Sequence, residues 1–261
     1  MLSSASTLGG LAATLQSSCF FLQHARAVSL PSCQSAAPPQ ATLTTVKTAF
    51  LNVSGFPFGV EYATHQKDTA FATLASNKQS MLAVLNTSNF NPTLSHQIPL
   101  PPTYGAAAGV TLSHTGKQLY IASGPGLIVV DTKLAAEGSA NAIIGILNGT
   151  TSTQQPGKEA IEVTLTHNDK YAFVSQEYGV NATDGPGNID VFELSHLAHN
   201  NSIIGMPIGF TNLGLEVVGS ALGRDGDILY ATAENETNSV NDTIMGYLNV
   251  LSVAEAQDQS K

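Results

Sequence analysis

Tryptophan is absent from this 261-residue chain, cysteine occurs only twice, and charged residues make up only 11% of it. Acidic residues outnumber basic ones by 19 to 10, and the lysines and arginines form no cluster. Nucleic acids and anionic membranes are bound through concentrated basic faces, so we expect neither as a partner. No uninterrupted stretch of about 18 apolar residues occurs, so we also expect no transmembrane segment.

The two cysteines, Cys19 and Cys33, are too few for a disulfide framework. They could form a single bridge in an uncleaved chain. If a leader is removed between them, Cys33 remains as an unpaired thiol. A zinc site is excluded by cysteine number alone, unless histidines and carboxylates supply its ligands.

What the chain has in quantity is glycine (23 residues), proline (12 residues) and short runs of valine, isoleucine, threonine and leucine. β-Branched residues favour strands, and glycine and proline favour the turns between them. This composition predicts an all-β fold built from many short strands. The hydrophobic content of 43% is ample for a sizeable core.

The N-terminal region differs from the rest because it contains no acidic residue and a single basic one, Arg26. Residues 8–21 are moderately apolar, and the sequence Ala-Arg-Ala at 25–27 has the small-x-small pattern of a signal-peptidase site. We therefore expect a signal peptide over residues 1–27, a low-complexity linker over 28–41 and the folded domain over 42–261. A disordered tail or a transit peptide are the alternatives.

Acceptor motifs for N-glycosylation, Asn-x-Ser/Thr, are more frequent than the composition requires. Chance would give about three in a chain of this composition. Asn followed by Ser or Thr also makes good turns, which is the alternative explanation. Together with the leader, the excess predicts an exported, glycosylated protein. The seven acceptors are Asn52, Asn86, Asn148, Asn181, Asn200, Asn235 and Asn241.

An internal repeat is the strongest signal in the sequence. Four segments align, at residues 60–73, 109–123, 162–175 and 219–232. One position holds His65, His114, His167 and Arg224, at successive spacings of 49, 53 and 57 residues. In each unit a strand leads to a polar turn, and a second strand follows the turn.

Two further strands follow in these units. Third strands are predicted at 80–85, 127–131, 188–194 and 246–253, and fourth strands at 96–100, 141–147 and 202–208. Four antiparallel strands in about 50 residues form one blade of a β-propeller. The sequence therefore predicts an all-β propeller of about four antiparallel, four-stranded blades, the last of which stops at its third strand.

Residues 112–123, LSHTGKQLYIAS, resemble the YVTN-type propeller repeat of lactonase-like seven-bladed propellers. The resemblance covers residues 55 to about 253. It implies the propeller fold for the domain over 42–261. It does not imply one activity, because enzymes, binding proteins and surface proteins all use this fold.

The chain departs from that family in two ways. Histidine or arginine replaces the proline of the consensus turn, and four units are present where the family has seven. Residues 42–53 are predicted to form an extra strand that could complete the last blade. The alternatives are a compact four-bladed ring and a shortened relative with exposed blade edges, and we favour the second.

The repeated histidines are predicted to be turn residues rather than metal ligands. Equivalent turns on successive blades are spread around a propeller, too far apart for bonds of about 2 Å to one ion.

Carboxylates give a better chemical candidate. Glu159 and Glu216 both lie eight residues before the repeated turn position, where an inner strand begins near the propeller axis. Such a pair could hold Ca²⁺ or Mg²⁺, or one member could have a raised pKa and act as an acid or base. The alternative is a pair of solvated glutamates at loop ends, since the first two units have Pro57 and Ala106 at this position.

The remaining ligand-binding candidates lie beside this pair. Lys158 and Glu162 flank Glu159 in the sequence, and Tyr104 precedes the corresponding strand of the second unit. No Gly-x-Ser-x-Gly motif, phosphate-cradling glycine loop or dinucleotide fingerprint is present.

Two functions follow from these features. The first is a secreted, glycosylated propeller that binds a protein or glycan partner. The second is a lactonase-like hydrolase that opens a small lactone with carboxylates lining the funnel, with or without a divalent cation. The predicted loops 176–187 and 234–245 carry three acceptor asparagines. Glycans there would crowd the expected site, which favours the first.

The predicted export can be tested by mass spectrometry of the native protein. We expect the N-terminal peptide to begin after Ala27, and Asn181 and Asn241 to carry glycans. An intact Met1 together with bare Asn181 and Asn241 would contradict export.

Overall fold

A computed structural model describes residues 49–76, 78–102, 106–149, 159–177, 187–194, 205–238 and 243–256. Contacts divide the chain after Lys47, and all of the described residues belong to the unit Thr48–Lys261. Within these residues, no helix has the length and apolar character needed to cross a bilayer.

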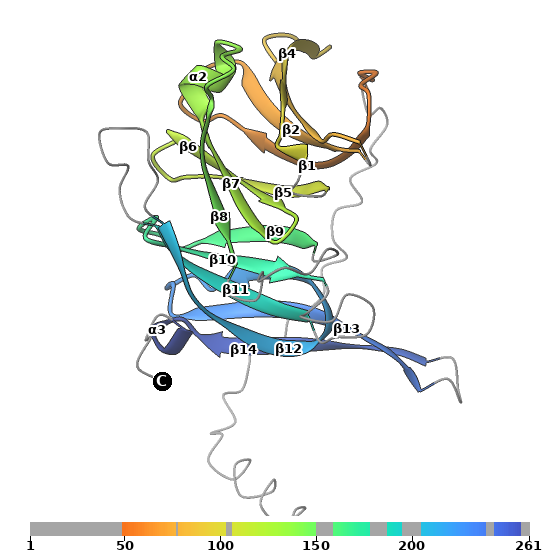
Figure 1. The fold of residues 1–261 in the computed structure, drawn as a ribbon, viewed down its shortest axis with the longest axis vertical. Helices are drawn as coiled ribbons and strands as arrows, with labels where there is room; N and C mark the ends of the chain where they lie inside the picture. Colours follow the sequence, from red (N-terminus) through yellow and green to blue (C-terminus); the bar gives the residue numbers. More distant parts are fainter. Residues whose placement is uncertain are drawn as a thin grey trace, which may run out of the picture. The chain divides into compact units, whose positions relative to one another are not determined.

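The regular secondary structure of the described residues is almost entirely β-strand, with two short helices, as the composition predicts (Figure 1). The strands are β1 (Phe56–Tyr62), β2 (Thr69–Ala75), β3 (Met81–Asn86), β4 (Thr93–Pro99), β5 (Ala107–Leu112), β6 (Gln118–Ser123), β7 (Gly126–Asp131), β8 (Ile143–Asn148), β9 (Ala160–Leu165), β10 (Tyr171–Gln176), β11 (Gly187–Leu194), β12 (Gly205–Leu222), β13 (Ile228–Asn238) and β14 (Thr243–Ser252). The helices are α2 (Thr132–Ala136) and α3 (Val253–Ala256).

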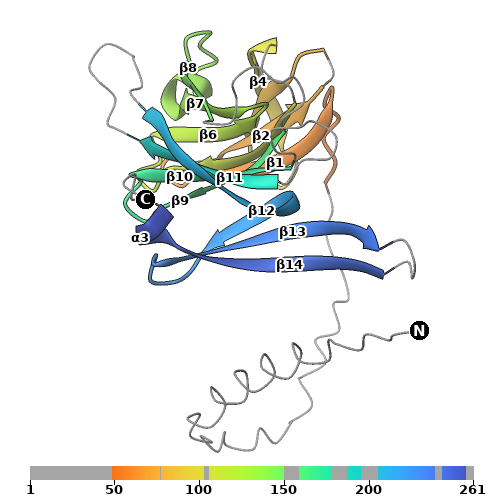
Figure 2. The same ribbon diagram turned by 60° about the horizontal axis from the view of Figure 1, so that its bottom comes forward.

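All neighbouring strands pair antiparallel, in the order β1-β2-β3-β4, β5-β6-β7-β8 and β9-β10-β11-β12-β13-β14. We call the first sheet blade 1 and the second blade 2. Blade 3 consists of β9, β10, β11 and residues 205–214 of β12. Blade 4 consists of residues 215–222 of β12, then β13 and β14. The prediction of an all-β propeller with four blades, the last three-stranded, is confirmed (Figure 2).

Strand β12 differs from its prediction. A fourth strand was expected to end at Ile208, but β12 continues to Leu222 and passes from one blade to the next. The partner changes from β11 to β13 where Gly214 has a φ of 128° and Glu216 a φ of 44°. A left-handed residue bends a strand without a loop, at a cost of about 1–2 kcal/mol when it is not glycine.

The repeated turns are confirmed, and each of them uses a residue with positive φ. These residues are Asp68, Gly116, Asp169 and Gly226. The left-handed conformation suits glycine and is tolerated by aspartate, which explains the residue types at these positions.

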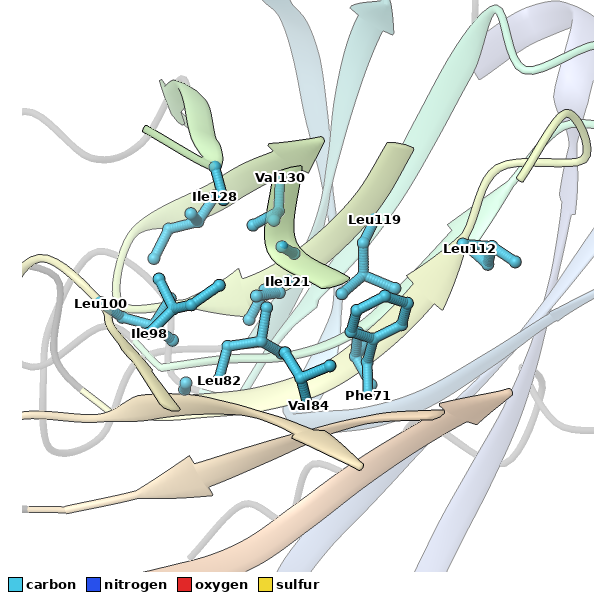
Figure 3. Close-up of a cluster of buried hydrophobic side chains, with 14 of the residues drawn as sticks. Phe71, Leu82, Val84, Ile98, Leu100, Leu112, Leu119, Ile121, Ile128 and Val130 are labelled. Carbon is cyan, nitrogen blue, oxygen red and sulfur yellow. The ribbon is translucent and has the colours of Figure 1, made fainter. Parts of the chain in front are cut away.

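Most of the core lies between successive blades. The face of blade 1 toward blade 2 carries Phe71, Leu82 and Val84, which pack against Leu119 and Ile121 of blade 2 (Figure 3). We call this the forward face of a blade, and the face that receives the preceding blade its rear face. The same forward-to-rear packing joins blade 2 to blade 3 and blade 3 to blade 4.

An aromatic residue and a valine stand opposite each other on the forward face of every blade. In blades 1 to 3 each is at most 5% exposed, whereas in blade 4 Tyr230 is 38% and Val250 62% exposed. No following blade among the described residues covers them. The four pairs are Phe71–Val84, Tyr120–Val129, Phe173–Val191 and Tyr230–Val250.

The rear face of blade 1 is open only along its inner strand, because Val53 packs against the buried cluster of Ala72, Leu74 and Ala83 on that face. Val60 is 69% and Tyr62 52% exposed, whereas Val110 and Leu112, at the same register in blade 2, are buried under blade 1. The extra strand predicted over residues 42–53 is not formed by residues 49–53, and the rest of that stretch lies outside the described residues. The described blades therefore do not close into a ring.

Phe173→Ala should show that packing between blades dominates stability. Its side chain is fully buried between blades 3 and 4, so we expect a loss of about 3–5 kcal/mol in the free energy of unfolding. Phe90→Ala, at an exposed loop residue, should cost about 0.5 kcal/mol or less. Denaturant titration measures both; equal losses would contradict the assignment of the core.

Candidate functional site

The inner strands β1, β5, β9 and β12 lie side by side along the axis of the propeller. Thr111 Oγ1 donates a hydrogen bond to the Val163 carbonyl over 2.7 Å, joining blade 2 to blade 3. Thr164 Oγ1 donates to the Ser220 carbonyl over 3.0 Å, joining blade 3 to blade 4. These threonines occupy the same register in their blades and connect strands that share no sheet hydrogen bonds.

Glycine lets two of these inner strands approach the next one closely. A Cβ at Gly59 would lie 3.0 Å from the Ala108 carbonyl oxygen, and one at Gly109 would lie 2.5 Å from that of Ile161. The Gly59 amide donates to Thr73 Oγ1 over 2.9 Å, and the Thr73 hydroxyl donates in turn to the Ala108 carbonyl. Larger residues at these two glycines would push the blades apart.

A cleft of about 740 Å³ opens against these inner strands. Its walls come from all four blades and combine carboxyl groups with apolar side chains. A cleft of this size and mixed lining is typical of a small-molecule site. Its carboxyl groups belong to Glu61, Glu159, Glu162 and Glu177, and its apolar side chains to Phe58, Val60, Val110, Ile161 and Val218.

Two of the glutamates are distinguished by their surroundings. The Ser220 amide donates a hydrogen bond to Glu162 Oε2 over 2.8 Å, which orients that carboxylate toward β12. Glu61 is half-buried, and burial raises the pKa of its carboxyl above the ordinary 4.5. Glu61 therefore binds a proton more readily than an ordinary glutamate does.

Sequence analysis did not single out Glu61. It pairs with Phe71, so it stands at the register where blades 2 and 3 have Thr111 and Thr164. The signal was hidden because the turn of blade 1 is one residue longer, which places Glu61 four residues before His65 rather than three. The replacement of threonine by Glu61 is seen only when the blades are aligned by strand pairing, and not when they are aligned by distance from the turn.

The structure brings some of the predicted site residues together. Glu159 and Glu162 both line the cleft, whereas Glu216 lies at the bend of β12 and is not among the described residues that line it. Tyr104 and Lys158 lie outside the described residues, so their predicted role is untested.

Some of the predicted glycosylation sites lie among the described residues, and others lie outside them. Asn52, Asn86 and Asn148 are exposed, as an acceptor must be. Asn235 lies in β13 rather than in the predicted loop, because β13 and β14 extend this hairpin to Asn238 and Thr243. The other three, Asn181, Asn200 and Asn241, lie outside the described residues.

The part of the chain that the structure describes contains no group of three histidine, cysteine, aspartate or glutamate side chains that could hold a metal ion. Ca²⁺ in proteins takes about six to eight oxygen ligands, several of them from carboxylates. The geometry of the cleft therefore gives no support to the predicted Ca²⁺ or Mg²⁺.

The repeated histidines lie in turns, as predicted, but they also connect successive blades. His114 Nδ1 lies 2.7 Å from Asp169 Oδ1, and the His114 amide donates to the same carboxylate over 2.9 Å. His167 Nε2 lies 3.1 Å from the Arg224 carbonyl oxygen. The rings of His114 and His167 are 6.1 Å apart, much closer than the sequence argument assumed. Their role is contact between turns.

Comparison with known proteins identifies the fold of this chain but no family to which it belongs. No family model matches the chain, and no curated protein matches it. Among solved structures it is similar to a candidate 6-phosphogluconolactonase from Bacteroides uniformis, with 16% identity, 76% of this chain and 55% of that chain covered and a TM-score of 0.52.

Two further solved structures resemble the chain to a similar degree. One is hydrazine synthase from Kuenenia stuttgartiensis, with 12% identity, 81% and 50% coverage and a TM-score of 0.54. The other is a candidate 6-phosphogluconolactonase from Bacteroides fragilis, with 13% identity, 75% and 56% coverage and a TM-score of 0.50. The chain spans about half the length of these proteins, and at such identities the likeness shows the fold alone.

The raised pKa of Glu61 predicts a pH-dependent effect on stability. Between the ordinary pKa of 4.5 and the raised value, the folded protein holds a proton that the unfolded chain has lost. The free energy of unfolding therefore falls as the pH rises through this window, and Glu61→Gln removes this loss of stability. We expect Glu61→Gln to be more stable than the original protein at about pH 7.5 and equal to it at about pH 3.5.

Thermal melts at several pH values measure this difference, and Glu137→Gln is the control because Glu137 is exposed and outside the cleft. A constant difference between Glu61→Gln and the original protein at all pH values would show that the Glu61 carboxyl does not titrate abnormally.

Proposed function

We propose that the cleft along the inner strands binds a small, uncharged, hydroxyl-rich molecule, such as a sugar or the end of a glycan. Four carboxyl groups line the cleft, and carboxylates accept hydrogen bonds from hydroxyl groups. Apolar side chains such as Phe58 and Ile161 offer surface to the C–H faces of such a ring. The acidic lining disfavours a phosphorylated ligand, because like charges repel.

The setting of this binding function is the extracellular space. The small-x-small pattern at residues 25–27 and the excess of acceptor motifs support export. The exposure of Asn52, Asn86 and Asn148 agrees with glycosylation at those positions. A glycan-bearing partner protein would present the same hydroxyl chemistry to the cleft as a free sugar.

A second candidate, the opening of a lactone, is favoured by the raised pKa of Glu61. A carboxylate of higher basicity is a better general base. In that reaction the Glu61 carboxylate takes a proton from water while the water oxygen bonds to the lactone carbonyl carbon. The ring C–O bond then breaks, and the proton passes to the departing ring oxygen, giving a hydroxy acid. Two of the similar structures are named as candidate 6-phosphogluconolactonases, which agrees with ring opening, whereas the phosphate in that name does not fit the acidic lining of this cleft.

Calorimetry with a panel of neutral sugars, sugar lactones and their phosphorylated counterparts tests the binding proposal. We expect a neutral sugar or lactone to bind, and Glu61→Gln and Glu162→Gln each to weaken it by about 10-fold or more, since each removes a charged acceptor. A glutamine at 162 can still accept from the Ser220 amide, so the fold is preserved. Glu137→Gln should bind unchanged. Preference for the phosphorylated ligands would contradict the proposal.

The same panel separates the two candidates when ring opening is followed by the release of acid. Turnover that is lost in Glu61→Gln but kept in Glu137→Gln would establish the hydrolase. Binding accompanied only by background hydrolysis would leave the cleft as a binding site.

A further inference from the structure

The forward face of blade 4 has the composition of a buried interface but is exposed. Leu248 is 65% exposed, although the aliphatic residues at its register in blades 1 to 3 are at most 1% exposed. Tyr230 and Val250 show the same contrast with their own counterparts. A surface patch of large apolar side chains marks an interaction site. The buried counterparts of Leu248 are Leu82, Leu127 and Ile189.

The rear face of blade 1 is the matching half along its inner strand, whereas Val53 already packs on Ala72 and Ala83 at its centre and has to move aside for a second copy. Val60 and Tyr62 stand where blades 2 and 3 have buried residues that receive the preceding blade. Each internal interface in this chain joins a forward face to a rear face, and this arrangement occurs three times. The exposed forward face of blade 4 and the exposed part of the rear face of blade 1 thus correspond to the two halves of an interface that the chain already forms.

The charges of the turn residues also favour the pairing of blade 4 with blade 1. The repeated turn position of one blade contacts the positive-φ residue of the next, as the His114 amide and ring do with the Asp169 carboxylate. Blade 4 has Arg224 at the repeated position, and blade 1 has Asp68, with a φ of 61°, at the positive-φ position. A forward face of blade 4 packed on a rear face of blade 1 would place a guanidinium beside a carboxylate.

We propose that these two faces pack together between two copies of this chain, and that the pair closes one ring of eight blades. A head-to-tail contact between copies closes when its rotation completes a circle. The four described blades of each of two copies together make eight, the upper end of the usual range for propellers. Each copy uses both of its free faces, so that no apolar blade face is left exposed. The two-fold axis is the propeller axis, so the clefts of both copies face one channel.

Light scattering coupled to size exclusion, with the full chain, tests the proposal. We expect a dimer that dissociates on dilution. Leu248→Lys and Val60→Lys, on opposite faces, should each raise the dimer dissociation constant by about 10-fold or more, because each places a charge in an apolar interface. Met206→Lys is the matched control, since Met206 is also a large exposed apolar residue but lies on β12 in blade 3, and the dimer should be unchanged.

Exchanging the charges of Arg224 and Asp68 distinguishes a second copy of this chain from any other partner that could cover these faces. Arg224→Asp should weaken the dimer, because two carboxylates then meet at each junction. Adding Asp68→Arg to it should restore association, with melting temperatures followed to confirm that every variant folds. Rescue by the double variant is expected only if Arg224 of one copy meets Asp68 of another.

A monomer at all concentrations would overturn the proposal and would mean that another segment or another protein covers these faces. A dimer indifferent to Leu248→Lys and Val60→Lys would overturn it as well. Open-ended oligomers that grow with concentration would exclude the closed ring.

Discussion

Every other feature of this structure depends on the packing of one blade's forward face on the rear face of the next. A four-stranded blade has two apolar faces and cannot bury either alone, so each blade is stable only beside a neighbour. The aromatic–valine pair at the centre of the forward face is the repeated unit of that packing, as at Phe71 and Val84. Where a neighbour is present, both members of the pair are buried.

This packing also brings the inner strands together and so creates the cleft. Adjacent inner strands share no sheet hydrogen bonds, and the close contacts at Gly59 and Gly109 hold their spacing. Blades 2 and 3 place a threonine at the register that faces the next strand, and blade 1 places Glu61 there. Blade 3 has Glu162 where the earlier blades have glycine. Glu61 and Glu162 make the cleft acidic, and both stand at positions where other blades have threonine or glycine.

The repeat was enough to predict the blades, because alternating strands and polar turns recur about every 50 residues. All third and fourth strands but one agree with the prediction to within three residues at each end. The exception, β12, has turn-favouring residues at Asn212 and Gly214, but no loop separates its two halves. It bends at Gly214 and Glu216, and a backbone angle of this kind leaves no signature when the residue is glutamate.

The candidate site was less predictable than the fold, for a reason of geometry. Glu159 and Glu162 were found because they stand at the start of an inner strand. Glu61 was missed because a turn one residue longer changed its distance from His65 but not its register. The contact between His114 and Asp169 was missed because it joins residues 55 positions apart. A single sequence shows positions within a repeat but not the contacts between repeats.

Assembly and ligand binding meet at the propeller axis, and electrostatics connects them. The chain carries a formal net charge of −9, and four glutamates line one cleft. Two copies that share one axis would bring eight such carboxyl groups around one channel, and their repulsion opposes closure. A hydroxyl-rich ligand donates hydrogen bonds to these groups and lowers that cost. By linkage, whatever ligand favours the closed ring is bound more tightly by it. If two copies close into one ring, ligand binding at the acidic cleft and assembly through the open faces are parts of one equilibrium.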